Sequence, residues 1–390
     1  MYLFRMHVAG KAVFGPGSLR ELPSVLESLG VKRPFLVTDE NMVKLRHADR
    51  VFEVLREAKL EPVGVFDGVE PEPSVETTDA AAEMARASGC DGVIGLGGGS
   101  CMDVAKAVAV LVKNEGSAAD YQGLDLVKKP GVPKVMIPTT AGTGSEVTFT
   151  AVLTRKRDGV KAGINDPKLF PEACVLDPEL TLSMPPRVTA SSGMDALVHA
   201  LESFVSRSSS PFSEMFSLKA IEMIARWIYK ATYCPRDLEA RSQMLLASYY
   251  GGIALANAGV GLCHSLAYPL GSDLGVPHGV ANALLIPYVV DYNCLAEVEK
   301  YSLVFDALLG QRRDDMSRLE KARSCADLLL EMVEALGLPT TLSALGVGAN
   351  LDDSAIERLA QKAMAVKRPI ENNPRTPSLE DCVEIYKKAL

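Results

Sequence analysis

Four side chains in the second half of the sequence have the chemistry of metal ligands. Asp195 and His199 lie four residues apart in SSGMDALVHALE, a stretch predicted to be helical, so both would project from one helical face. His264 lies in GLCHSLAY near a predicted helix end, and His278 lies in PHGVAN at the opening of another segment. One carboxylate with three imidazoles is a ligand set suited to Fe(II), Zn(II) or a similar divalent ion.

The same histidines admit a second interpretation. A single histidine in an apolar stretch is commonly a core residue whose ring nitrogens are satisfied by hydrogen bonds. The chain has only five histidines, however, and these three stand in separate Gly- or Ala-rich contexts. Residue types and spacing alone leave both interpretations open.

A glycine cluster in the first half of the sequence has the pattern of an anion-binding turn. The stretch DGVIGLGGGS reads as a strand that runs into Gly97, Gly98, Gly99 and Ser100, and a helix is predicted directly after it. Glycines let backbone N–H groups approach a phosphate, and the start of a helix adds positive potential. The stretch matches neither GxGxxG nor the P-loop pattern, so a simple tight turn remains the alternative.

Two further segments offer polar groups of the same kind. Asp39 closes an early predicted strand, where its carboxylate could accept hydrogen bonds from an adenosine ribose and repel a 2′-phosphate, favouring NAD over NADP. The alternative is that Asp39 only caps the following helix. The stretch TTAGTGSE follows another strand and suits contacts to phosphate and ribose, or is a hydroxyl-rich turn.

The elements around these residues change character along the chain. In the first half, predicted strands at 34–39, 62–66, 91–95 and 135–138 alternate with helices at 48–59, 75–88 and 101–112, which is typical of a parallel sheet covered on both faces. Beyond Met184, Pro185 and Pro186 the pattern is helical, with helices predicted at 189–204, 213–229, 238–258, 296–309 and 316–336. We therefore expect an α/β domain over 1–183 and an all-α domain over 184–390.

The composition narrows the class of protein. The formal net charge of −8 disfavours a general nucleic-acid binder, and no run of about 18 apolar residues indicates a membrane span. The N-terminus lacks the long apolar region of a signal peptide, and the eight cysteines form no CxxC pair. These features predict a reduced, cytoplasmic protein.

Several stretches, taken together and in order, resemble the iron-containing (group III) alcohol dehydrogenase family. They are FGPGSL, GLGGGSCMDVAKA, PTTAGTGSEVT, GMDALVHALE, GLCHSLAYPLG, PHGVANALLIPY and NPRTPSLEDCVEIY, and they cover nearly the whole chain. The resemblance implies a dehydroquinate-synthase-like fold, with a dinucleotide domain, a helical domain and an active site in the cleft between them. It also implies an NAD(H)-dependent alcohol dehydrogenase or aldehyde reductase that forms a homo-oligomer, a dimer or larger.

The resemblance assigns roles to individual residues. It implies that Asp195, His199, His264 and His278 hold the metal, Fe(II) first and Zn(II) or Mn(II) as alternatives, which polarises the substrate oxygen during hydride transfer at nicotinamide C4. The residues that it places at the dinucleotide are Asp39, Gly97, Gly98, Gly99, Ser100, Thr139, Thr140, Thr143, Thr148, Lys161 and Leu180.

The sequence departs from the family pattern at several positions. Many relatives carry a histidine where this chain has Tyr268, which would either relay the alcohol proton or only line the cleft. Glu72 replaces an asparagine of some relatives. The substrate-side candidates are Thr150, Ala254, Lys367 and Arg368: Ala254 replaces a bulky aromatic, and the two cations could bind the anionic group of a semialdehyde, sulfoaldehyde or phosphonoaldehyde or be solvated surface charges.

Two other classes of function compete with a dehydrogenase. A lyase of the dehydroquinate synthase type shares the fold, but its dense set of basic residues and its metal ligands differ from those found here. A non-catalytic NAD-binding or metal-binding protein would not need the complete ligand set.

Overall fold

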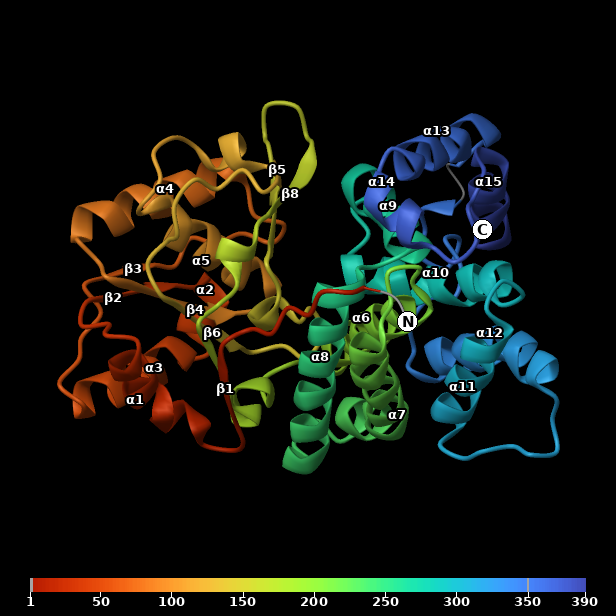
Figure 1. Cartoon of the computed structure of the whole chain (residues 1–390), viewed down its shortest axis with the longest axis horizontal. Coiled ribbons are helices and arrows are strands. Elements are labelled where there is room, and N and C mark those ends of the chain that lie inside the picture. Colours follow the sequence, from red (N-terminus) through yellow and green to blue (C-terminus); the bar gives the residue numbers. More distant parts are fainter. Residues whose placement is uncertain (1–2, 349–350) are drawn as a thin grey trace. The chain divides into compact units, whose positions relative to one another are not determined.

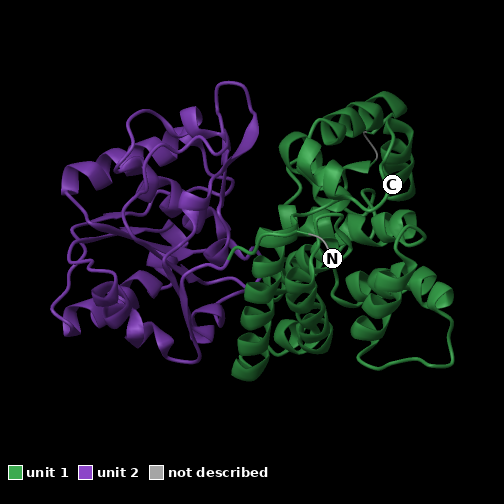
Figure 2. Ribbon diagram, viewed as in Figure 1, with its two compact units in different colours: residues 1–7, 185–390 green, residues 8–184 purple. Residues whose placement is uncertain are grey.

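The computed structural model describes residues 3–348 and 351–390, which form two compact units (Figure 2). The α/β unit comprises Val8–Met184, and the helical unit comprises Pro185–Leu390 with the N-terminal residues up to His7. The backbone N–H of His7 donates to Oδ1 of Asn257 at 2.7 Å, and Nδ2 of Asn257 donates back to the carbonyl of His7 at 2.9 Å. This exchange ties the start of the chain to the helical unit, whereas the sequence grouped it with the first domain. Residues 1–2 and 349–350 of the predicted domains lie outside the described residues.

A six-stranded parallel sheet forms the centre of the α/β unit, with strand order β1-β9-β6-β4-β2-β3. The strands are β1 Lys11–Phe14, β2 Pro34–Val37, β3 Gly64–Phe66, β4 Gly92–Gly97, β6 Lys134–Pro138 and β9 Ala173–Leu176. The chain passes from β2 to β3 on one side and then returns to place β4 on the other side of β2. This reversal is the topological switch point at which parallel α/β sheets bind ligands.

Helices cover both faces of the sheet, as the alternation of strand and helix predicted (Figure 1). They are α1 Leu22–Ser28, α2 Glu40–Lys44, α3 His47–Glu57, α4 Val75–Ser88 and α5 Gly99–Leu111. One core cluster packs Leu26 of α1 and Val51 of α3 against Leu36, Ile94 and other residues of the sheet. The helix α5 begins at Gly99, two residues before the predicted start, because the glycines themselves open the helix.

A second, three-stranded sheet adds to the predicted architecture. It consists of β5 Gly123–Leu124, β8 Lys161–Asn165 and β7 Thr150–Thr154, in that order, and β7 pairs antiparallel with β8. Five short 3-10 helices join the elements of this unit: η1 Ser18–Glu21, η2 Ala118–Tyr121, η3 Ser145–Val147, η4 Pro167–Leu169 and η5 Pro178–Thr181. Neither β7 nor β8 was predicted from the sequence.

The described part of the helical unit contains ten α-helices. They are α6 Pro186–Val205, α7 Pro211–Tyr233, α8 Leu238–Ala258, α9 Leu262–Leu274, α10 His278–Asn293, α11 Val298–Leu309, α12 Arg318–Ala335, α13 Asp353–Met364, α14 Lys367–Asn372 and α15 Leu379–Lys388. The predicted change from α/β to helical structure is confirmed. The helix α6 begins with Pro186 at its first position, where a proline removes no hydrogen bond, and its second half is buried. Its neighbours include α7, α8 and α10.

Among the described residues, no single helix is long and apolar enough to cross a membrane. The pair α8 and α9, bent by 104°, meets that test of length and composition when the two are taken together.

Candidate metal centre and dinucleotide site

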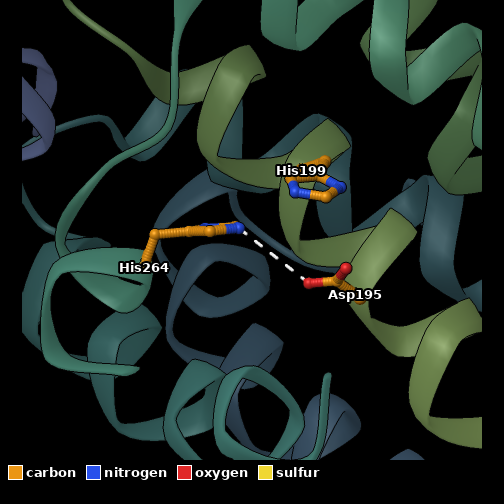
Figure 3. A group of neighbouring side chains, drawn as sticks. All are labelled: Asp195, His199 and His264. Atoms are coloured by element: carbon orange, nitrogen blue, oxygen red, sulfur yellow. Dashed lines mark ion pairs between the residues drawn. The ribbon is translucent and has the colours of Figure 1, made fainter. Parts of the chain in front are cut away.

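Three of the four predicted metal ligands converge in the helical unit (Figure 3). Asp195, His199 and His264 are buried, and one potential ligand atom from each lies within 4.8 Å of the other two. Asp195 and His199 come from consecutive turns of α6, as their spacing predicted. The rings of His199 and His264 stack with their centroids 4.7 Å apart.

The fourth predicted ligand, His278, lies beside this group. Its Nε2 is 3.7 Å from Oδ1 of Asp195, and the corresponding distance from Nε2 of His264 is 3.9 Å. His264 is the third residue of α9 and His278 is the first residue of α10. The side chain of His278 is 33% exposed, against 2% for His264 and 5% for Asp195, so His278 is the one of these three that is partly exposed.

The histidines determine the electrostatics of the buried carboxylate. Burial raises the pKa of Asp195, but the three imidazoles and a hydrogen bond from Asn282 outweigh it and hold the pKa below the ordinary value. A carboxylate that stays charged in a buried site, surrounded by three nitrogen ligands, suits a divalent cation. The donor set therefore fits a divalent metal ion.

Two polar residues that the sequence analysis did not single out support the ligands. Nδ1 of His264 lies 2.6 Å from Oε2 of Glu202, and Nδ2 of Asn282 donates to Oδ1 of Asp195 at 2.7 Å. Glu202 stands three residues after His199 on α6, and Asn282 stands four residues after His278 on α10. Extending the helical spacing by one turn beyond each histidine would have found both.

The segment that begins with Asn373 holds the start of α9. Oδ1 of Asn373 accepts from the backbone N–H of Leu262 at 3.3 Å, and its amide exchanges hydrogen bonds with that of Asn293 at 2.8–2.9 Å. The NPR stretch of the sequence therefore anchors the helix that carries His264.

Tyr268 lies one turn after His264 and stacks on His278, another predicted ligand. Its ring is nearly parallel to that of His278, at 11°, with the centroids 5.7 Å apart. Burial raises the pKa of Tyr268 well above its ordinary value, and the nearby charges of Glu202 and Asp195 add to this effect. The side chain is therefore a neutral phenol packed against the cluster.

Several of the predicted dinucleotide residues of the α/β unit lie at the carboxyl edge of the large sheet. Asp39 follows β2, the glycines end β4 and open α5, Thr139 and Thr140 follow β6, and Leu180 lies in η5 after β9. The backbone N–H of Thr139 donates to the carbonyl of Gly97 at 3.0 Å, which joins the ends of β4 and β6. Leu180 is fully buried in the core cluster, so only its backbone is available to a cofactor.

The glycine turn is closely packed and leaves its backbone accessible. A Cβ atom on Gly99 would lie 2.8 Å from the Thr143 side chain, and Gly97 has a φ of 140°, which favours glycine. Oγ1 of Thr140 faces Gly98 and is buried with no hydrogen-bond partner. A glycine turn at a helix start, with a hydroxyl that lacks a partner beside it, fits the phosphates of a dinucleotide.

Asp39 caps α2 and contacts the glycine turn. Its Oδ1 accepts from the backbone N–H of Met42 at 2.9 Å, and its Oδ2 accepts from the thiol of Cys101 at 3.2 Å. The capping role that the sequence left open is present, and each oxygen retains a second lone pair for a ribose hydroxyl.

Buried charges hold the loop between β6 and β7. The fully buried ammonium of Lys106 donates to the carbonyl of Ser145 and to Oγ1 of Thr148, and lies 3.0 Å from Asp103. Burial lowers the pKa of Lys106, while Asp103 opposes this effect. Two predicted site residues, Thr148 and Thr150, are therefore fixed by contacts inside the unit, since Oγ1 of Thr150 also donates to Asn165 at 2.9 Å.

The remaining predicted residues have local surroundings of their own. Lys161 forms an ion pair with Glu72 at 3.0 Å, and Glu72 has a φ of 53°, in the left-handed region. Ala254 is fully buried in α8. Lys367 and Arg368 begin α14, which packs against α9, and both side chains are exposed.

Comparison with known proteins identifies relatives over the full length of the chain. A family model described as iron-containing alcohol dehydrogenase matches residues 9–178, and the C-terminal model of the same family matches residues 189–390. A long-chain-alcohol dehydrogenase of Geobacillus thermodenitrificans is 40% identical over 96% of this chain and 94% of its own length.

Solved structures agree with this match. A crystal structure of a 1,3-propanediol oxidoreductase superposes with a TM-score of 0.95 at 32% identity, covering both chains fully. A sulfoacetaldehyde reductase from Bifidobacterium kashiwanohense, solved in complex with NAD+, superposes with a TM-score of 0.90 at 30% identity, covering 100% of this chain and 99% of that one.

Removing a predicted ligand tests the metal centre. His264→Ala or His278→Ala should lose most bound metal and nearly all turnover, because each removes one imidazole from the cluster, while NAD binding to the α/β unit persists. Metal content by mass spectrometry and NAD titration measure the two effects. His7→Ala, outside the cluster, is the control and should keep its metal. Full metal and activity in His278→Ala would show that the ligand assignment is wrong.

Proposed function

The chain belongs to the iron-containing alcohol dehydrogenase family, and within it we propose an NAD(H)-dependent enzyme that interconverts a small alcohol and its aldehyde. The observation that carries this proposal is the buried convergence of Asp195, His199 and His264, with His278 alongside. Such a ligand set with one accessible side is typical of a catalytic rather than a closed structural metal site.

Each part of the chain has a task in this reaction. A divalent ion held by Asp195, His199, His264 and His278 would supply Lewis acidity at the substrate oxygen, and a bound nicotinamide would exchange the hydride. Asp195 contributes the buried negative charge that retains the cation. His278 is the partly exposed ligand, so we place the approach of the substrate on its side, where the Tyr268 ring packs against it. The hydroxyl of Tyr268 as a proton relay stays a prediction.

We assign Fe(II) as the metal and NAD as the dinucleotide, with Zn(II) or Mn(II) as alternative ions. The nitrogen-rich ligand set and the matched family support the metal. The glycine turn, the Thr140 hydroxyl without a partner and the carboxylate of Asp39 support the dinucleotide, as does the NAD+ complex of a related reductase. The dinucleotide contacts of the sequence analysis, Lys161 included, belong to this proposal.

We further propose that the chain is a cytoplasmic homo-oligomer with a small-molecule substrate and no nucleic-acid or membrane partner. A net charge of −8 supports the absence of a nucleic-acid partner, and cysteines without a CxxC pair support a reducing compartment. The small-molecule substrate and the homo-oligomer rest on the family.

A narrower substrate class, short anionic aldehydes, is favoured by one observation. Solved structures similar to this chain include a sulfoacetaldehyde reductase, whose name refers to an aldehyde that carries a sulfonate. In this chain Lys367 and Arg368 are the cations proposed to hold such a group, on a helix that packs against the helix of His264. Ala254 and Thr150 are the other residues proposed to shape the substrate space.

A turnover screen tests the general proposal. The purified chain, loaded anaerobically with iron, zinc or manganese in parallel, should oxidise NADH in the presence of small aldehydes. We expect the rate to depend on the metal, with iron supporting turnover. No NADH oxidation with any metal across neutral and anionic aldehydes would contradict an alcohol dehydrogenase.

The charge of Asp39 should set the preference for NADH over NADPH, because a carboxylate repels the 2′-phosphate. Asp39→Gly should reduce or reverse the difference between the kcat/KM for NADH and the kcat/KM for NADPH. Since Asp39 also caps α2, Asp39→Ser is the matched variant: it keeps a capping hydroxyl and removes only the charge. A wild-type enzyme that prefers NADPH would contradict this prediction.

Matched aldehydes test the anion site. Succinic semialdehyde should exceed butanal in kcat/KM by tenfold or more, since a charge-assisted contact contributes about 1.5–3 kcal/mol. The preference should shrink in Lys367→Ala or Arg368→Ala and at high salt. If the two aldehydes react equally, or if neither variant changes the preference, the two residues are solvated surface charges.

A further inference from the structure

We propose that Glu202 is a positioning residue of the metal centre, which holds His264 in the tautomer whose Nε2 is available to the ion. This inference rests on the proposed metal site and deepens it by adding a residue that binds no metal itself.

The contacts of an ionised Glu202 select one tautomer of a neutral His264 ring. Its Oε2 lies 2.6 Å from Nδ1 of His264, and its Oε1 accepts from the backbone N–H of Cys263 at 2.6 Å. The Glu202 and His264 side chains are only 3% and 2% exposed. A carboxylate only accepts hydrogen bonds, so Nδ1 of His264 must carry a proton. In the neutral ring this leaves the lone pair on Nε2, the nitrogen that is closer to Asp195.

Helix geometry couples this contact to the other ligands. Asp195, His199 and Glu202 occupy positions i, i+4 and i+7 of α6, so they lie along one face. One rigid helix therefore presents a ligand oxygen, a ligand nitrogen and the carboxylate that orients a third ligand from α9. Histidine ligands in metalloproteins commonly donate their second ring nitrogen to a carboxylate in this way.

A purely structural role is the main alternative, because Glu202 also caps the start of α9. Asn373 provides a comparison within the same structure. Its Oδ1 accepts from the backbone N–H of Leu262, the residue before Cys263. Its other side-chain hydrogen bonds join Asn293 and the carbonyl of Arg375 rather than a histidine. Loss of Asn373 should therefore weaken the same helix start without changing the His264 tautomer.

The variant Glu202→Gln keeps the shape of the side chain, but its two terminal atoms can no longer both accept a hydrogen bond. Its amide has one oxygen and one NH2 group, but both partners of Glu202 are donors. If the NH2 group faces His264, the ring must move its proton to Nε2, which blocks metal binding. If the NH2 group faces Cys263, two donors oppose each other at the start of α9.

The experiment compares Glu202→Gln, Glu202→Asp and Asn373→Ala with the wild-type chain. Metal-free protein is titrated with Co²⁺ and Zn²⁺ in competition with a chromophoric chelator, and the histidine tautomers are read from 15N NMR of the metal-free chain. The five histidines make the spectrum tractable, and His264→Ala identifies the His264 signals. We expect Glu202→Gln to raise the metal Kd about 10- to 100-fold and to lower the share of the Nδ1–H tautomer, because the glutamine amide can turn its NH2 group toward His264. Glu202→Asp, which retains a carboxylate, should recover part of both.

Three results would overturn the inference. They are a wild-type Kd with an unchanged tautomer in Glu202→Gln, a loss of metal affinity in Asn373→Ala as large as that in Glu202→Gln, and a Glu202→Asp variant no better than Glu202→Gln. The Glu202→Asp variant also serves as a second test of the inference if the Glu202→Gln variant fails to fold. Failure of the proposed metal site would be recognised separately: wild-type protein and His278→Ala would then bind the metal equally weakly.

Discussion

The burial of two carboxylates on one helix is the constraint on which the helical unit depends. Taking a charge out of water costs several kcal/mol unless donors or cations surround it, and α6 places Asp195 and Glu202 two turns apart in the interior. The surrounding elements supply the compensation: imidazoles and the Asn282 amide meet Asp195, while the Cys263 N–H and the His264 ring meet Glu202. Helix N-termini carry N–H groups without intrahelical partners. Because α9 starts beside Glu202, its free N–H group gains an acceptor and the buried carboxylate gains a donor.

The same logic explains where the histidines stand in their helices. His264 and His278 occupy the first turns of α9 and α10, and each lies within 4 Å of Asp195. A residue in a first turn is held by the contacts at the start of its helix, and Asn373 provides one such contact at α9. In the α/β unit the corresponding constraint is the switch point of the sheet. There β2 and β4 are neighbours, so Asp39 at the end of β2 lies beside the glycine turn at the end of β4.

The sequence predicts what depends on local spacing and leaves open what depends on long-range contacts. Four-residue spacing was enough to place Asp195 and His199 on one face of α6, but nothing local relates His264 to a residue sixty positions earlier; only the ordered family motifs did. The sequence left two roles for Asp39, a helix cap or a cofactor contact, and the lone pairs of its two carboxylate oxygens allow both. Glu202 and Asn282 were missed because their types are ordinary on a helix; each stands one turn after a predicted ligand, but only their contacts with His264 and Asp195 show what they do. The strands β7 and β8 were missed because their pairing with each other, rather than a hydrophobic run, defines them.

Charge balance gives the pairing of Asp195 with Glu202 a consequence for ion choice. A divalent cation held by three neutral imidazoles and Asp195, with Glu202 nearby, would give the site zero net charge, whereas a monovalent or trivalent ion would leave an uncompensated charge. The arrangement therefore selects for a double positive charge. Among divalent ions it discriminates only through ligand type and geometry, and a set of three nitrogens with one oxygen accepts iron, zinc and manganese alike. Which of them acts is then a question of supply and of how tightly Glu202 and Asn282 fix the donor atoms, since stiffer ligands admit fewer coordination geometries.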